Sequence, residues 1–290
     1  MTSPAQAWLP DGRLHLQHGP IDLVIGARGA ASGIERAQQQ AWHRFQDILA
    51  TLVAELPLLR APVGDAYPLA RGPVARRMVA ACWPHRARFI TPMAAVAGSV
   101  ADEMLAAMLA GGSLQSAYVN DGGDIAIWVA PGERLHAGIV NHPLRPTLDA
   151  TLRLDRACGV ATSGWRGRSH SLGIADAVTV LGGDAAAADA AATLLANAVD
   201  VDHPPIRRVP ARELRHDSDL GELAVTVAVG ELPATCVAEA LDRGVRAAHA
   251  MQQAGLIRAA YLALQGQTRV AASPGVAGCD KLSAMRGSAC

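Results

Sequence analysis

The first third of the chain shows an alternating pattern followed by a helical one. Apolar and polar residues alternate over residues 13–18, and extended structure resumes over residues 21–25, which predicts a β-hairpin. Ser32 and Glu35 then have the spacing of a capping box, with serine at the N-cap. Apolar residues recur behind them at helical spacing, so we expect one long amphipathic helix that ends near Glu55.

Prolines mark the starts of two further helices. Pro73 opens the first, and Thr91 followed by Pro92 opens the second, which runs to Leu109 before two glycines. The first turns of the second helix are almost all small residues. Another helix, a ligand or a second copy of the chain in a homodimer can therefore approach it closely. Apolar runs predict strands at 116–120, 125–129, 136–140, 151–154, 159–162 and 175–181.

The pattern changes after an Ala-rich helix that Asp184 is expected to cap. Three prolines predict a linker over residues 201–210, between a core over residues 1–200 and a β-α-β part over residues 211–272 that completes the same fold. The tail over residues 273–290 is rich in Gly, Ser and Ala and is predicted to be flexible. Because hairpins and helices mix without strict alternation, the predicted fold class is α+β, with antiparallel and mixed sheets and packed helices.

Composition narrows the classes of function. Lys plus Arg equals Asp plus Glu, 26 each, so the chain lacks the basic excess of a general nucleic-acid binder. The five cysteines are scattered and odd in number, which is typical of reduced thiols in the cytoplasm. Neither a signal peptide nor an uninterrupted apolar run of about 20 residues is evident. We therefore expect a soluble cytoplasmic protein, no membrane or nucleic-acid partner, and a small-molecule ligand.

The first candidate segment is the polar turn between two apolar runs. It reads Asn120, Asp121, Gly122, Gly123 and Asp124. The glycines allow positive φ and leave backbone N–H groups uncovered beside three polar side chains, which suits a ligand. An ordinary hairpin turn explains the Asp-Gly pair equally well, although Asn120 and Asp124 add more polar groups than a turn requires.

The second candidate segment follows an apolar strand. It contains Thr162, Ser163, Gly164, Arg166 and His170. Arginine, hydroxyl groups and free backbone N–H groups are suited to phosphate oxygens, and histidine can move a proton near neutral pH. A surface histidine held by a hydrogen bond is the alternative for His170, but the density of polar groups favours a site.

The third candidate is a pair of oxygen-bearing side chains on the Ala-rich helix. Asp189 and Thr193 are four residues apart, so they share one helix face. A carboxylate and a hydroxyl so placed can bind Mg²⁺, which prefers oxygen ligands and keeps several waters. Asp189 can equally complement the helix dipole.

Six motifs in order resemble one family. They are TPMAAVAGSVADEML (Thr91–Leu105), VNDGGDIAI (Val119–Ile127), GVATSG (Gly159–Gly164), Ser169-His170, ADAVTV (Ala175–Val180) and ADAAATLLANAV (Ala188–Val199). Together they resemble the ApbE-like superfamily, most closely its branch of uncharacterised function, over about residues 13–200. The better-known members are FAD:protein FMN transferases, which bind FAD and Mg²⁺ and attach FMN to a threonine or serine of a target flavoprotein.

The resemblance implies roles for the candidate residues. Asn120, Gly122, Gly123 and Asp124 would contact the nucleotide. Thr162, Ser163 and Gly164, with Arg166, would lie near the pyrophosphate. Asp189 and Thr193 would be the metal ligands, and His170 would correspond to an active-site histidine. The transferases continue with an Ile-Asp-Pro…Thr-Gly stretch that this chain lacks, so Asp176 is the carboxylate available as a second catalytic residue.

The resemblance therefore leads to a protein that binds FAD, FMN or a similar phosphorylated ligand with Mg²⁺, and FMN transfer is the reaction to test. Two alternatives stay open at this point. One is an enzyme for a non-flavin small metabolite on the same scaffold, acting through His170, Asp124 and Arg166. The other is a catalytically silent accessory protein that stores or delivers a cofactor, because sites diverge faster than folds.

Overall fold

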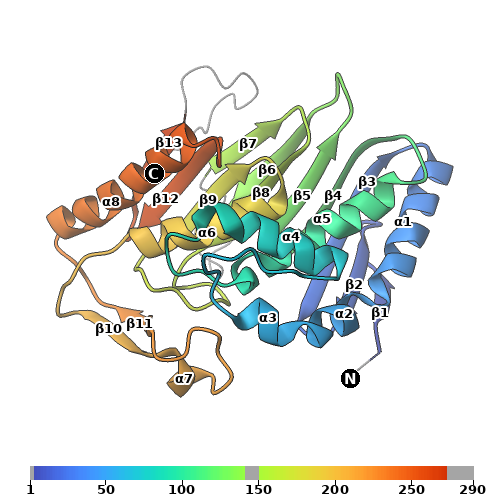
Figure 1. The fold of residues 1–290 in the computed structure, drawn as a ribbon. Coiled ribbons are helices and arrows are strands. Elements are labelled where there is room, and N and C mark those ends of the chain that lie inside the picture. Colours follow the sequence, from blue (N-terminus) through green and yellow to red (C-terminus); the bar gives the residue numbers. More distant parts are fainter. Residues whose placement is uncertain (1–2, 141–149, 273–290) are drawn as a thin grey trace. The chain divides into compact units, whose positions relative to one another are not determined.

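The computed structural model describes residues 3–140 and 150–272, which divide into two units (Figure 1). Unit 1 contains residues 1–134, 155–161 and 182–190, and unit 2 contains residues 135–154, 162–181 and 191–290. The chain passes between the units within strand β8 (Cys158–Ser163) and helix α6 (Ala185–Ala198). Helices combined with mainly antiparallel strands confirm the predicted α+β class.

Unit 1 is built on an antiparallel sheet with the strand order β1-β2-β3-β4-β5-β8. Its other strands are β1 (Ala5–Trp8), β2 (Leu14–His18), β3 (Ile21–Gly29), β4 (Leu114–Asp121) and β5 (Asp124–Val129). Its helices are α1 (Ala31–Phe45), α2 (Ile48–Ala54), α3 (Leu56–Arg60), α4 (Pro73–Cys82) and α5 (Val96–Leu109), with short 3₁₀ helices η1 (Trp83–His85) and η2 (Pro92–Ala95). The hairpin predicted before residue 26 is confirmed as β2 and β3.

The core of unit 1 lies between this sheet and its helices. Helix α5 packs on β4 and β5, and α1 lies beside it (Figure 1). The strand register places Ile25, Val119 and Ala126 in one buried row across β3, β4 and β5. The window Pro92–Leu109 has the length and apolar composition of a membrane span, with a mean hydropathy of 1.3, but half of it is buried inside the protein. We therefore interpret it as a core helix.

Unit 2 holds the end of β8 followed by β9, β12 and β13 in one sheet. Its elements are β6 (Leu135–Ile139), β7 (Ala150–Leu154), β9 (Ala177–Gly182), β10 (Ile206–Pro210), α7 (Ala211–Leu214), β11 (Ala224–Val229), α8 (Ala234–Gln253), β12 (Ala259–Leu264) and β13 (Gln267–Ala272). Helix α8 lies along β12 and β13 (Figure 1), and every residue of β12 is buried. Strands β6 and β7 pair as a hairpin, as do β10 and β11.

Two differences from the sequence prediction concern the long N-terminal helix. Its N-cap is Ala30, so Ser32 lies inside the first turn and the expected capping box does not form. The helix also ends at Phe45 and restarts at Ile48. Asp47 between them has φ −113° and forms an ion pair with Arg44. Local side-chain bonding of an aspartate to a neighbouring turn thus interrupts the apolar period that suggested one helix.

Two further differences concern the C-terminal part. The single strand predicted over residues 259–270 is a hairpin, because Gln265 and Gly266 adopt φ 43° and 79° and reverse the chain. Residues 206–210 of the predicted linker form β10, which pairs with β11. The prolines that suggested a linker lie before this strand and at its last position. The predicted flexible tail, residues 273–290, lies outside the described residues.

Candidate functional site

The polar turn in unit 1 is the two-residue loop of the β4–β5 hairpin. Gly122 and Gly123 adopt φ 66° and 115°, and Asp121 pairs with Asp124 across the strands. The Asn120 Oδ1 atom accepts the Gly123 N–H at 2.8 Å, so this predicted ligand contact stabilises the turn itself. A Cβ atom placed on Gly123 would meet no atom within 4 Å, which leaves the space in front of the turn open. Both interpretations of this segment, turn and ligand contact, are therefore compatible with its geometry.

Asp189 lies close to the carboxylates of that turn. Burial raises its pKa well above the usual range, and the nearby charges of Asp124 and Asp121 raise it further. Its Oδ2 atom accepts the backbone N–H of Gly98 at 3.0 Å, near the start of α5. The structure thus brings together Asp124 and Asp189, two residues predicted from separate motifs, and adds Asp121, which the sequence analysis passed over. Burial, with Asp189 nearby, also raises the pKa of the Cys82 thiol, so this cysteine is an inert core residue.

Helix α5 fixes the end of the helix that carries Asp189. The Asp102 carboxylate accepts the backbone N–H groups of Ala185 and Ala186, at 3.0 and 2.9 Å, which are the first two residues of α6. A Cβ atom on Gly98 would lie 2.3 Å from the Ala185 carbonyl oxygen, so only glycine permits this approach. The partner of the small-residue stretch predicted at the start of α5 is therefore a helix.

Thr193 lies one turn beyond Asp189 on α6 and is half-buried, so the two share a helix face as predicted. Within the described residues, no three His, Cys, Asp or Glu side chains form a group that could hold a metal ion. The nearby donors are hard oxygens from carboxylates and a hydroxyl. This donor set fits Mg²⁺ bound by one or two protein oxygens and completed by phosphate oxygens and water, rather than an all-protein cage.

In unit 2, Asp176 holds the loop that follows β8. Its carboxylate accepts three bonds: from Trp165 Nε1 at 3.2 Å, from Arg166 Nε at 2.7 Å and from the Gln265 backbone N–H at 2.6 Å. The Arg166 guanidinium also stacks on the Trp165 ring, 4.5 Å from its centroid. Asp176 is therefore a structural anchor in this structure, and it makes no hydrogen bond with His170.

The other predicted residues of this loop fall into two groups. The Thr162 and Thr179 hydroxyls lie 2.8 Å apart, and a Cβ on Gly164 (φ 156°) would lie 2.6 Å from the Asp176 carbonyl oxygen, so both serve local packing. Ser163 and His170 are half-buried. The chain just after His170 is anchored because the Asn197 side-chain oxygen accepts the Leu172 N–H at 2.9 Å.

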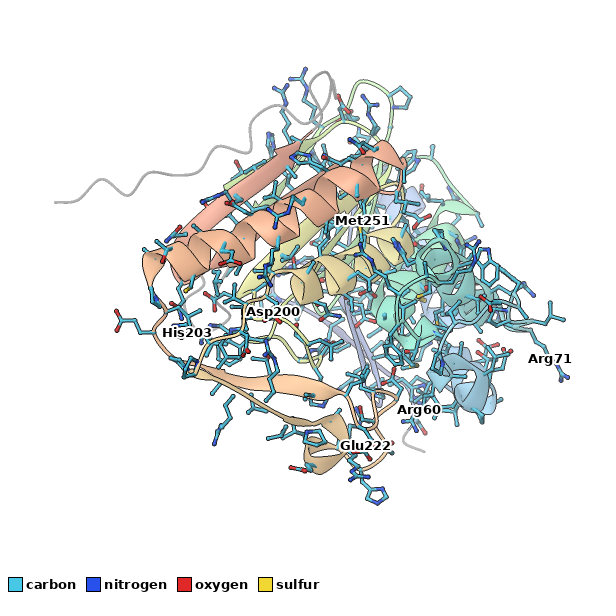
Figure 2. All side chains as sticks on the ribbon, turned by 60° about the vertical axis from the view of Figure 1, so that its left-hand side comes forward. Arg60, Arg71, Asp200, His203, Glu222 and Met251 are labelled. Carbon is cyan, nitrogen blue, oxygen red and sulfur yellow. The ribbon has the colours of Figure 1, made fainter. Side chains whose placement is uncertain are left out.

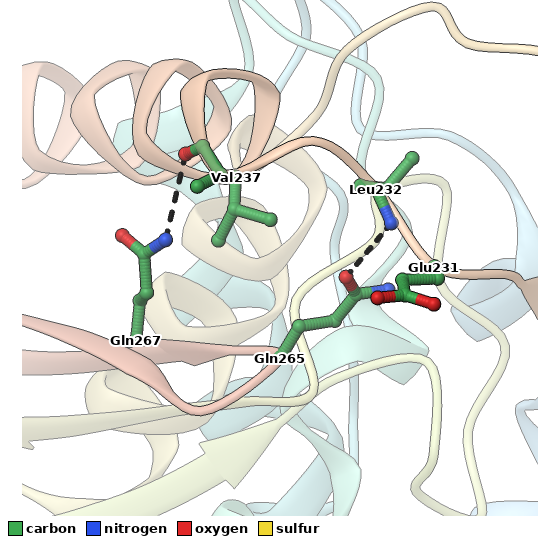
Figure 3. Close-up of a pocket in the computed structure, with 6 residues that line it drawn as sticks. Glu231, Leu232, Val237, Gln265 and Gln267 are labelled. Atoms are coloured by element: carbon green, nitrogen blue, oxygen red, sulfur yellow. Dashed lines mark hydrogen bonds between the residues drawn. The ribbon is translucent and has the colours of Figure 1, made fainter.

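Two more polar features of unit 2 were not anticipated. Asp200 forms an ion pair with Arg208 and lies, like His203, on the segment between α6 and β10 (Figure 2). A hollow of about 520 Å³ lies between the start of α8 and the β12–β13 turn (Figure 3). Its lining residues are Glu231, Leu232, Ala234, Val237, Gln265 and Gln267. None of the predicted site residues lines this hollow.

These features define an α+β protein with a helix-bound aspartate beside a Gly-Gly-Asp turn. A family model described as "AbpE bacteria" matches residues 6–270, and the chain belongs to this family, within the ApbE-like superfamily. The predicted kinship is confirmed.

Relatives of uncharacterised function agree with the predicted branch. A UPF0280 protein of Methanothrix thermoacetophila is 39% identical over 134 residues, covering 45% of this chain and 54% of the relative. One of Methanosphaerula palustris is 34% identical over 190 residues, covering 64% of this chain and 77% of the relative. The chain spans about half the length of the first curated relatives it matches.

Among solved structures, the chain is similar to the apo form of Pseudomonas stutzeri flavinyl transferase ApbE, with a TM-score of 0.42, 14% identity and 92% of each chain covered. It is also similar to flavin transferase ApbE from Vibrio cholerae, with a TM-score of 0.41, 12% identity, and 94% and 98% of the two chains covered.

Proposed function

We propose that this protein binds a flavin nucleotide, FAD or FMN, together with Mg²⁺, and that Asp189 and Thr193 are its metal ligands. The observation that carries the proposal is the approach of Asp121 and Asp124 to Asp189, whose pKa is raised by burial and by those two charges. Several carboxylates in a desolvated place repel one another, and a divalent cation removes that cost. Membership of the ApbE-like superfamily supports flavin nucleotide as the ligand.

The chain's own residues supply the rest of the proposed binding. The open space at Gly123 lets a ligand reach the backbone of the turn, with Asp124 beside it. In unit 2, Arg166 is a candidate for phosphate oxygens, and Thr162, Ser163 and Gly164 present hydroxyls and backbone next to it. Mg²⁺, when bound, neutralises charge on a pyrophosphate. His170 is the proposed proton-transfer residue.

The proposed reaction of bound FAD is transfer of FMN to a threonine or serine hydroxyl of a target flavoprotein in the cytoplasm. The pyrophosphate bond breaks, AMP leaves, and a phosphate ester to the hydroxyl forms. A second candidate is cofactor binding without catalysis. It is favoured by the three donors that occupy the Asp176 carboxylate, because a carboxylate so engaged is a poor proton acceptor.

Titration calorimetry with FAD, with and without Mg²⁺, tests the proposal, while AMP release is followed in the same samples. We expect Mg²⁺-dependent binding with a micromolar Kd, about 8 kcal/mol of binding free energy. Asp189→Asn keeps an oxygen for the α5 N–H groups but removes the charge, and Thr193→Val keeps the shape but removes the hydroxyl. Each should weaken Mg²⁺-dependent binding by about tenfold or more.

The exposed Asp242 on α8 offers a matched control, because Asp242→Asn removes a carboxylate of unit 2 that contacts Arg269 at 3.3 Å. This variant should bind FAD as the unmodified protein does. Binding without AMP release would favour the accessory role, and AMP release would favour the transferase. No binding at about 100 μM FAD would exclude a dedicated flavin site.

A further inference from the structure

An exposed group of aromatic, aliphatic and arginine side chains lies on unit 1. Two segments form it: the loop before α4, residues 61–72, and the chain after α4, residues 83–90. The Val63 N–H donates to the Ile90 carbonyl oxygen at 2.8 Å. The rings of Tyr67 and Trp83 meet edge to face with centroids 5.0 Å apart. We name this surface the aromatic–arginine patch, and its residues are Tyr67, Leu69, Trp83, Arg86, Arg88 and Phe89.

The apolar members of the patch are unusually exposed for so large a group. Leu69 is 84% exposed, Tyr67 is 47% exposed and Phe89 is 41% exposed, in a chain that is only 3% aromatic. Single exposed apolar residues are ordinary on protein surfaces. Several gathered on two adjoining segments are typical of a surface that another molecule covers.

The backbone beneath the patch is well anchored. The Glu55 carboxylate accepts the N–H groups of Arg71 and Gly72, both at 2.7 Å, which fixes the end of the loop. The Arg86 guanidinium stacks over the Trp83 ring at 4.5 Å from its centroid. The exposed side chains are therefore presented by a fixed surface, and a partner has little ordering cost to overcome when it binds.

The patch is also positively charged in a chain with no net charge. Residues 60–90 contain six arginines and a single acidic residue, Asp65. Arg71, Arg86 and Arg88 form no ion pair with the described part of the chain. Figure 2 shows the side chain of Arg71 directed away from the ribbon, into solvent. Unpaired cations beside apolar side chains call for carboxylates or phosphates on whatever covers them.

We propose that the aromatic–arginine patch is the docking surface for a protein partner that presents carboxylates beside an apolar side chain. Tyr, Trp and Arg are the residues most enriched in the energetic centres of protein interfaces, and complementary charge guides the partner into place. None of the patch residues belongs to the candidate flavin site, so this inference stands apart from the proposed function.

Two other partner classes fit less well. Single-stranded nucleic acid needs open ring faces for its bases, but Arg86 already stacks on the Trp83 ring and Tyr67 contacts the same ring. Membrane surfaces are bound by large apolar faces such as amphipathic helices. Here the loop and the turn after α4 offer only Leu69 as a highly exposed apolar side chain.

Fluorescence anisotropy with a labelled random copolymer of glutamate and tyrosine tests the proposal, because this probe presents carboxylates beside rings in every order. The comparison probes are a labelled thymidine oligonucleotide and vesicles of phosphatidylcholine with phosphatidylserine. The patch variants are Arg86→Glu with Arg88→Glu, and Leu69→Ser. The matched control is Arg243→Glu with Arg246→Glu on α8, which makes the same charge change at exposed positions of unit 2.

We expect the copolymer to bind, and to bind more weakly as salt is raised from about 50 to about 200 mM. The double patch variant should weaken binding by about tenfold or more, and Leu69→Ser by several-fold, while the control variant binds as the unmodified protein does. Melting temperatures of all variants should agree, because every changed side chain is exposed. Three results would overturn the proposal: no copolymer binding, equal binding by the double patch variant, or a patch-dependent preference for the oligonucleotide or the vesicles.

Discussion

Asp102 and Asp189 each cap the N-terminus of the helix that carries the other. Asp102 lies in α5 and accepts the first two N–H groups of α6, at 3.0 and 2.9 Å. Asp189 lies in α6 and accepts the Gly98 N–H of α5 at 3.0 Å. Carboxylates at helix N-termini satisfy N–H groups that have no partner within the helix and complement the helix dipole. The position of the proposed metal ligand therefore depends on the contact between these two helices.

Gly98→Ala should break this contact. The new Cβ would lie 2.3 Å from the Ala185 carbonyl oxygen, a backbone atom that can move only if α6 moves. We expect a loss of about 1 to 3 kcal/mol in the free energy of unfolding, measured by urea denaturation. Gly112→Ala is the control, because its Cβ would meet its nearest atoms at 3.8 Å. Equal stability of the two variants would show that α5 and α6 do not need glycine at this approach.

Asp102 should give the protein an unusual dependence on pH. Burial raises its pKa to about 6, against the opposing effect of the Ala186 and Ala185 N–H groups. Its value in the unfolded chain is about 3.9. Between about pH 4 and pH 6 the folded state thus binds more protons than the unfolded state, so this group lowers the free energy of unfolding as pH rises through that window. The full effect is about 3 kcal/mol.

Asp102→Asn isolates that contribution. The asparagine does not titrate, and its amide oxygen still accepts one of the two α6 N–H groups. Chemical denaturation at several pH values from about 4 to 7 should show the unmodified protein losing more stability with rising pH than the variant does. Asp189, with its pKa raised by burial, contributes in the same direction in both proteins, so it cancels from the difference. Parallel pH profiles would contradict the assignment to Asp102.

Local pattern predicted most of the elements but not where helices start or break. The hairpin of β2 and β3, the α4 start at Pro73 and the Asp184 cap of α6 all follow from neighbouring residues, and the structure confirms each one. The α1 start failed because Ala30, not Ser32, is the N-cap. The break at Asp47 also failed, because apolar spacing continues across it while the backbone does not.

The candidate site was predictable only as separate motifs. The sequence pointed to Asp124 and Asp189, but nothing in a linear pattern shows that their charges lie close enough to interact. Asp102 was missed because an aspartate in an exposed-looking helix turn carries no signal of its own. Its spacing of four residues from Gly98, matched by Ala185 and Asp189 on α6, was the available clue.

Asp176→Asn should loosen the loop that follows β8. The amide cannot accept three donors as well as the carboxylate does, and it loses the charge that holds Arg166 at 2.7 Å. We expect a loss of about 1 to 2 kcal/mol in the free energy of unfolding and faster tryptic cleavage after Arg166 or Arg168. Fluorescence should change as well, because Trp165 loses a partner. Asp242→Asn is the exposed control and should leave cleavage and fluorescence unchanged.

Gln265 provides a test of backbone strain in the β12–β13 turn. It is the one non-glycine residue with positive φ among the described residues, at 43°. Its side chain compensates by accepting the Leu232 N–H at 3.1 Å and donating to the Gly230 carbonyl oxygen at 2.7 Å. Gln265→Gly relieves the strain but loses both bonds, whereas Gln265→Ala loses the bonds and keeps the strain.

The two variants should therefore differ in a defined order. We expect Gln265→Gly to cost about 1 to 2 kcal/mol in the free energy of unfolding, because two hydrogen bonds outweigh the strain that is relieved. Gln265→Ala should cost about 1 kcal/mol more than that, which is the penalty of holding a Cβ at positive φ. The backbone N–H of residue 265 can still donate to Asp176 in both variants, so the difference between them reports on the turn alone. An alanine variant as stable as the glycine variant would mean that β12 and β13 hold this turn without strain.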